Sequence, residues 1–248
     1  MRPVKKARPA PSISQHIGIV ACSAEGAALC YRTICIEGGR LLGAHAHPEV
    51  SMHTLSLGDY MARIYDGDWD GVAEMMLESA GKLARIGADF LICPDNTVHQ
   101  ALPRLMPRSP LPWLHIAEVV ASEAAARGYR RVGISGTRWL VASDIYPEKL
   151  AAKGIACVRP VDAERDGISR IIMDELVYGD FRPSSIAYFQ QVFGNLKTIG
   201  CDAVILGCTE IPLIMNDANS PLPTLDSTRL LARAALHRAW LPPEPIHS

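Results

Sequence analysis

The chain has 248 residues, which is long enough to bury a core in one large domain or in two small ones. Its formal net charge is −1 and its pI is about 6.7, so it lacks the basic surface that nucleic acid or an anionic membrane attracts. Its apolar runs are strand-sized, far shorter than the roughly 20 residues that cross a bilayer. We therefore expect a small-molecule partner, no nucleic acid and no membrane.

The first 16 residues mix basic residues with prolines and lack the apolar segment of a secretory signal, so we expect a flexible tail over residues 1–16. The seven cysteines are an odd number without paired spacing, which argues against a disulfide framework and favours a cytoplasmic location. There is no CxxC pair and the eight histidines lack metal-ligand spacing. We expect no metal site.

Short apolar runs alternate with amphipathic stretches along the chain, a pattern typical of βαβ units and a parallel sheet. The apolar runs predict strands over residues 17–21, 50–55, 90–93, 113–116, 131–135, 156–159, 203–206 and 224–225. Apolar residues at three- and four-residue spacing predict helices over residues 69–86, 116–127, 143–153, 167–178 and 184–199. The expected fold class is α/β.

Two segments of the chain resemble each other. Residues 86–97 and 199–209 both read as a helix that ends at glycine, a buried strand, and a polar turn that opens the next helix. The repeat predicts two similar domains that face one another. Because ligands bind at the carboxyl ends of parallel strands, both polar turns are expected at one shared cleft.

The later of these turns, over residues 207–212, is the most informative motif. Cys208 follows a buried strand and precedes a helix, where unsatisfied N–H groups favour a thiolate, so it is a candidate base or nucleophile. A free cysteine is more often a small buried hydrophobe. Because Thr209 and Glu210 follow directly, we favour a functional site.

The earlier turn, over residues 93–99, offers donors for a carboxylate. Asn96 and Thr97 provide polar side chains and main-chain N–H groups at a helix start. Capping of that helix is the simpler role, and the pairing with the Cys208 turn favours a site. His53, near the end of a strand, is either a substrate contact or a satisfied core histidine.

Four motifs of the chain occur together in one known family. They are Asn-Thr-x-His from residue 96, Leu-His-Ile-Ala-Glu from residue 114, Gly-Thr-Arg from residue 136 and Gly-Cys-Thr-Glu-Ile from residue 207. Over residues 17–239 the chain resembles the aspartate/glutamate racemase superfamily. The resemblance implies two Rossmann-like domains with pseudo-twofold symmetry, a homodimer, an amino-acid or related carboxylate substrate, and catalysis without pyridoxal phosphate or another cofactor.

The resemblance also implies domain limits and residue roles. We expect a first domain of residues 17–113 plus 222–248 and a second of residues 114–221. Racemases of this family use two opposed acid/base groups, of which Cys208 supplies one. Asn96, Thr97 and Thr209 would hold the α-carboxylate, Glu210 would orient the Cys208 turn, and Ser23 in the first loop is a further substrate-binding candidate.

The chain departs from the family pattern at the other acid/base group. Members usually carry a cysteine immediately before Asn-Thr, and here that position is Asp95, with Cys93 two residues upstream. If the backbone stays extended through Pro94, both side chains project to the same side. We prefer Asp95 on spacing and keep Cys93 as the alternative.

The substrate side chain is open at this point. A lysine that several aspartate-acting members carry is Gly167 here, and Arg32, Arg138 and Arg165 are its possible replacements. Two alternatives to racemisation also stand. The first is a single-thiol decarboxylase or isomerase of a carboxylic acid, and the second is a non-catalytic carboxylate-binding protein. Exchange of the α-proton with solvent would separate them from a racemase.

Overall fold

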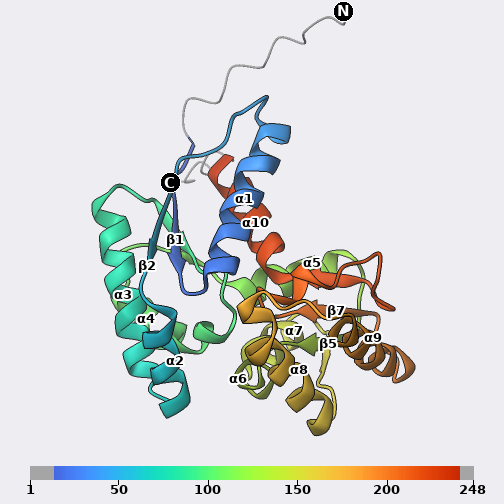
Figure 1. Ribbon diagram of the computed structural model, residues 1–248. Helices are drawn as coiled ribbons and strands as arrows, with labels where there is room; N and C mark the ends of the chain where they lie inside the picture. The colour runs from blue at the N-terminus through green and yellow to red at the C-terminus, as the bar shows by residue number, and fades with distance from the viewer. Residues whose placement is uncertain (1–13, 241–248) are drawn as a thin grey trace, which may run out of the picture.

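Two four-stranded parallel sheets form the framework of the protein in the computed structural model, which describes residues 14–240 (Figure 1). The strand orders are β2-β1-β3-β4 and β6-β5-β7-β8. The strands are β1 (Ile17–Ala21), β2 (Val50–Thr54), β3 (Phe90–Ile92), β4 (Trp113–Leu114), β5 (Arg131–Ser135), β6 (Ala156–Val158), β7 (Ala203–Leu206) and β8 (Thr224–Asp226). The predicted α/β class with two similar halves is confirmed, and each predicted strand is present within two residues of its expected end.

Helices connect the strands. They are α1 (Ala24–Leu41), α2 (Leu57–Asp66), α3 (Trp69–Arg85), α4 (Leu102–Leu105), α5 (Ile116–Ala126), α6 (Arg138–Ala142), α7 (Ile145–Ala151), α8 (Asp162–Asp174), α9 (Pro183–Thr198) and α10 (Ser227–Trp240), with short 3₁₀ turns η1 (Thr97–Ala101), η2 (Met106–Arg108), η3 (Leu176–Tyr178) and η4 (Ile211–Leu213). The sequence predicted α3, α5, α7, α8 and α9 and did not predict α1, α2, α4, α6 or α10. Helix α10 is buried on several sides, so its apolar residues form no single stripe.

Each sheet is covered on both faces. Helices α2 and α3 pack on one face of the first sheet, and α1 and α10 pack on the other. In the second sheet α5 and α7 cover one face, and α8 and α9 cover the other. Figure 1 shows α1 and α10 side by side at one end of the molecule, with α8 and α9 at the far side of the second sheet. Burial of both faces explains why the strands read as continuous apolar runs.

The chain passes from the first half to the second between β4 and α5, and returns between β8 and α10. Helix α10 contacts both α1 and α5, so it joins the core of the first sheet to that of the second. Strand β8 pairs with β7 of the second sheet, Leu206 lying opposite Asp226. We expected residues 222–248 in the first domain, and this is wrong for β8, because a predicted strand of only two residues carries no information about its partner strand. Residues 241–248 lie outside the described part of the chain.

The N-terminal boundary also differs from the expected one. Residues 1–13 of the expected tail lie outside the described residues. His16 is buried and its main-chain N–H donates to Asp89, while the N–H of Gln15 donates to the carbonyl of Ala239. The expected tail is therefore wrong for Gln15 and His16, which are held by long-range hydrogen bonds. Within residues 14–240, none of the helices has the length and apolar character needed to span a bilayer.

The predicted internal repeat is present in three dimensions. Gly87 and Gly200 both adopt left-handed backbone, with φ of 90° and 87°, between the preceding helix and the strand. Two residues later, the carboxylates of Asp89 and Asp202 accept main-chain N–H groups just ahead of β1 and β5. The two segments therefore enter their sheets in the same way and deliver the turns after β3 and β7 to equivalent places.

Candidate active site

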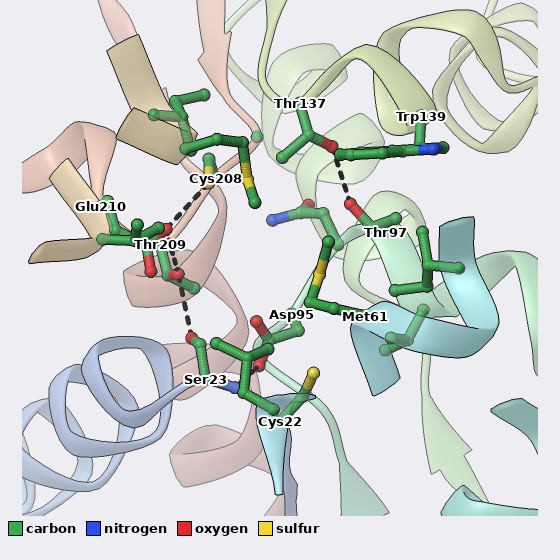
Figure 2. Close-up of a pocket in the computed structure, with 18 of the residues that line it drawn as sticks. Cys22, Ser23, Met61, Asp95, Thr97, Thr137, Trp139, Cys208, Thr209 and Glu210 are labelled. Carbon is green, nitrogen blue, oxygen red and sulfur yellow. Dashed lines mark hydrogen bonds between the residues drawn. The ribbon is translucent and has the colours of Figure 1, made fainter. Parts of the chain in front are cut away.

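A cavity of about 360 Å³ lies between the two halves, at the carboxyl ends of β1, β3, β5 and β7 (Figure 2). Its volume is near the small end of the roughly 300–1,000 Å³ usual for ligand pockets. Both repeated turns line it, together with the loop after β1 and the start of α6. The shared cleft that the sequence predicted is therefore present. The sequence-predicted residues that line it are Ser23, Asp95, Asn96, Thr97, Cys208, Thr209 and Glu210.

Asp95 reaches the cavity from the turn after β3. Its carboxylate accepts the main-chain N–H of Ser23 at 3.0 Å. Burial raises the pKa of Asp95 to about 7, and the negative charge of Glu210 adds to the rise, while the hydrogen bonds from Ser23 oppose it. A carboxyl group with this pKa can accept or give up a proton at neutral pH, as a general acid/base group must.

Cys208 reaches the same cavity from the turn after β7. Its thiol donates to the carboxylate of Glu210 at 2.8 Å. Burial and then the charge of Glu210 raise the pKa of Cys208 well above its usual value of 9.0. The expected stabilisation of a thiolate is wrong, because the following helix is only the three-residue turn η4 and a carboxylate lies against the sulfur. Cys208 is a protonated thiol at neutral pH.

A chain of hydrogen bonds connects the two halves below the thiol, as Figure 2 shows. The Thr209 hydroxyl donates to the same Glu210 oxygen at 2.7 Å, and the Ser23 hydroxyl lies 3.1 Å from the Thr209 oxygen. Gly26 packs so closely here that an added Cβ would lie 2.3 Å from the Thr209 methyl group. The position of the Cys208 turn is therefore fixed by polar contacts and by close packing against α1.

Asn96 and Thr97 fasten the first half to the second. The Asn96 amide donates to Ser227 at 3.0 Å and accepts the hydroxyl of Tyr146 at 2.5 Å. The hydroxyls of Thr97 and Thr137 lie 2.9 Å apart. One N–H and the oxygen of the Asn96 amide are thus held by protein partners, which leaves its second N–H, and donation from the side chain to a substrate stays a prediction.

Main-chain donors remain available in both turns. None of the hydrogen bonds found among residues 14–240 uses the N–H groups of Asn96, Thr97, Cys208 or Thr209 as donor. N–H groups gathered at the start of a helical turn form a natural site for an anion. The two turns together can therefore hold a carboxylate between the halves without a charged side chain.

Cys93 lies behind the cavity wall, with its thiol 3.9 Å from the main-chain carbonyl oxygen of Asp95. It is fully buried in the core between β3 and α3, beside Leu91 on the same face of the strand, and does not line the cavity. Our expectation that Cys93 and Asp95 project to the same side is wrong, because β3 ends at Ile92 and the strand alternation does not continue through Pro94. In the repeat, Asp95 corresponds to Cys208, and Cys93 corresponds to the buried Leu206.

His53 also lies apart from the cavity, so the expected substrate contact is wrong. It sits on the edge strand β2, and its Nδ1 lies 3.0 Å from the hydroxyl of Ser79 on α3. The position of the missing lysine is closed as well, since a Cβ on Gly167 would lie 2.1 Å from the Tyr188 oxygen. None of the candidate replacements Arg32, Arg138 and Arg165 lines the cavity.

The apolar wall of the cavity was not predicted from the sequence. This wall comes from α2, η1, α6, α8 and η3, and its members are Leu57, Met61, Ile64, Tyr65, Val98, Trp139, Ile172, Met173, Val177 and Tyr178. Asp95 and Glu210 are the only charged residues lining the cavity in the described part of the chain. Within residues 14–240, no group of three or more His, Cys, Asp or Glu side chains is arranged to hold a metal ion.

The sequence and structure of the chain were compared with those of known proteins. The family model for Asp/Glu/Hydantoin racemase matches residues 35–235. The chain belongs to that racemase family. Its structure is similar to that of a putative Asp/Glu racemase from Yersinia pestis, with a TM-score of 0.84 and 28% identity over 92% of this chain and 100% of that one.

Other racemases are also similar to the chain. The broad specificity amino-acid racemase RacX of Bacillus subtilis is 24% identical over 172 residues, which are 68% of this chain and 73% of RacX. A glutamate racemase of Thermus thermophilus is 32% identical over 161 residues, 63% of this chain but only 57% of the glutamate racemase. The structure of an aspartate racemase homologue from Pyrococcus horikoshii has a TM-score of 0.77 at 26% identity, covering 91% and 99% of the two chains.

Proposed function

We propose that the protein is an amino-acid racemase that inverts the α-carbon by proton transfer involving Asp95 and Cys208. The observation that carries this proposal is that two groups at equivalent positions of a structural repeat line one cavity and differ in protonation at neutral pH. Membership of the racemase family favours this activity over a decarboxylase, another isomerase or a binding protein.

In one direction Asp95 is the base and Cys208 the acid. The Asp95 carboxylate removes the α-proton from one face of the substrate, and the Cys208 thiol delivers its own proton to the opposite face. Asp95 then holds the proton and Cys208 is left as a thiolate. The opposite direction starts from that second distribution, in which the proton is on Asp95. No other group is needed for proton transfer itself.

The main-chain donors would serve the reacting centre. The substrate carboxylate is held by N–H groups of Asn96, Thr97, Cys208 and Thr209, and negative charge flows onto it when the α-proton leaves. Glu210 acts through Cys208, because its hydrogen bond fixes the direction of the sulfur. Ser23 has a positioning role as well, since its N–H holds the Asp95 carboxylate.

Exchange of the α-proton with solvent tests the proposal. The protein is incubated with L- and D-amino acids in deuterated water, and loss of the α-proton signal is followed by NMR together with chiral analysis. We expect exchange accompanied by inversion, without added pyridoxal phosphate or metal ion. Release of carbon dioxide, or the absence of exchange for every amino acid, would contradict racemase activity.

We also propose that the protein works as a cytoplasmic homodimer. All seven cysteines are free, which suits a reducing compartment. The dimer rests on the family resemblance and is tested by light scattering at the concentration used in the activity assay. A mass equal to one chain under assay conditions would contradict it.

A further inference from the structure

We infer that the substrate carries an apolar side chain, aliphatic or aromatic, in place of a second carboxylate. The inference rests on the proposed racemase function and concerns the part of the cavity that lies beyond Asp95 and Cys208. It is carried by two independent features of the lining, its charge and its apolar wall.

The charge of the lining disfavours an acidic substrate. Asp95 and Glu210 are both carboxylic acids, and no lysine, arginine or histidine lines the cavity within residues 14–240. An amino acid with an apolar side chain is a neutral zwitterion, whereas aspartate or glutamate adds a further negative charge. That charge would lose water, and the only charged side chains in the lining are carboxylates of its own sign, a cost that an apolar side chain avoids.

The wall of the cavity is complementary to a hydrocarbon side chain. Met61 and Tyr65 of α2 line the cavity together with Trp139 of α6 and Met173 of α8, so both halves contribute. The rings of Tyr65 and Trp139 meet edge to face with centroids 5.3 Å apart, which closes the wall between the halves. Figure 2 shows Met61 projecting between Asp95 and the Thr97–Thr137 pair.

Neither Arg138 nor the position of Gly167 supplies a positive charge to the cavity. The guanidinium of Arg138 lies over the Trp139 ring, 4.5 Å from its centroid, outside the lining. Gly167 packs against Tyr188, so no longer side chain fits at that position. The mouth is bordered by Tyr178, of which 81% is exposed, which leaves room for side chains of different lengths.

The test compares kcat/KM across a panel of phenylalanine, leucine, methionine, lysine, aspartate and glutamate, measured by exchange in deuterated water. We expect kcat/KM for the three apolar amino acids to exceed that for aspartate and glutamate by at least about 100-fold, the scale on which an unpaired buried charge is rejected. Equal or faster exchange with aspartate, glutamate or lysine would overturn the inference.

A variant that introduces a positive charge into the cavity wall gives a second test. In Met61→Lys a cation enters the wall, so we expect the ratio of kcat/KM for glutamate to that for phenylalanine to rise at least about tenfold. The matched control is Met52→Lys, because Met52 is half exposed on the edge strand β2 and does not line the cavity. An unchanged ratio in Met61→Lys, or the same rise in both variants, would overturn the inference.

Binding distinguishes failure of this inference from failure of the racemase proposal. Calorimetric titration of the Cys208→Ser protein with phenylalanine, leucine and glutamate requires no turnover. We expect the apolar amino acids to bind at least about tenfold more tightly than glutamate. Tighter or equal binding of glutamate, or no binding of phenylalanine and leucine, overturns the inference. Apolar binding without exchange in the parent protein would overturn only the racemase proposal.

Discussion

The turn after β3 and the turn after β7 occupy equivalent places in the two sheets, yet they carry different chemistry. Asp95 and Cys208 correspond in the repeat and both line the cavity. The Asp95 carboxylate accepts a main-chain N–H, whereas the Cys208 thiol donates to the carboxylate of Glu210. The repeat fixes where a reactive group lies, and its immediate neighbours fix which state of that group is stable.

This difference decides where the proton resides in the free protein. Asp95 has a pKa raised to about 7 by burial, and the pKa of Cys208 lies well above 9.0 because burial and Glu210 both disfavour a thiolate. Above about pH 7, the stable arrangement is therefore a carboxylate on one face and a thiol on the other. Each of the following experiments alters one side of this pair.

The largest effect is expected on the Cys208 side. In Cys208→Ser the hydroxyl is far less acidic than the thiol, so it is a far poorer proton donor to carbon and is not ionised to the base that the opposite direction needs. Turnover should therefore fall by at least about 10⁴-fold. Racemisation is measured by chiral chromatography, and thermal unfolding checks the fold. The control is Cys157→Ser, because Cys157 is partly buried on β6 and lies outside the cavity. Near-normal activity of Cys208→Ser would refute its assignment.

The next largest effect is expected on the Asp95 side. Asp95→Asn keeps size and hydrogen bonding but removes proton transfer, which typically contributes 10²–10⁴-fold, so kcat should fall by roughly that factor. Cys93→Ala should cost far less, because Cys93 lies in the core and outside the cavity. An inactive Cys93→Ala with a nearly normal Asp95→Asn would assign the role to the thiol and contradict the asymmetric pair.

The pH dependence follows from the same pair. Both directions require that Asp95 and Cys208 hold one proton between them, so kcat/KM should rise with pH through about 7, where the pair loses its first proton, and fall only well above pH 9, where it loses the second. The profile of an apolar substrate is measured over this range in the parent protein. If kcat/KM for the residual activity of Asp95→Asn still rises with pH near 7, a group other than Asp95 titrates there and the assignment is contradicted.

A smaller effect is expected when the partner of the thiol is changed. Glu210→Gln removes the charge that raises the pKa of Cys208, so that pKa should fall. The glutamine amide oxygen accepts the thiol more weakly than the carboxylate does, and this weaker orienting bond should lower kcat by roughly 10-fold. Alkylation of Cys208 by iodoacetamide is followed against pH by peptide mass spectrometry, with Cys201 as internal reference. Slower alkylation of Cys208 at a given pH would contradict this sign.

The smallest effect concerns the two enantiomers. Because enantiomers have equal free energies in water, kcat/KM must be the same in both directions whatever the acid/base pair. The unequal pair should appear instead as different kcat values, matched by different KM values, in time courses started from each enantiomer. Identical kcat values in both directions would indicate that proton transfer does not limit turnover.

Much of the framework was predictable because it depends on local signals. Apolar runs located all eight strands, and glycines at 87 and 200 marked the helix ends. The helix with an even distribution of buried residues, α10, was missed because periodicity needs an exposed face. The pairing of β8 with β7 was not predicted, because the sequence of a three-residue strand does not indicate which strand it pairs with.

The sequence by itself determined that Cys208 and the Asp95 turn belong to one site, because a repeated strand-and-turn pattern places both at the same edge of two similar sheets. The tertiary structure decided that Asp95 faces the cavity while Cys93 is buried, since strand alternation ends at Ile92. It also decided the character of the substrate wall, because Met61 and Trp139 lie far apart in the chain and meet only when the two halves pack together.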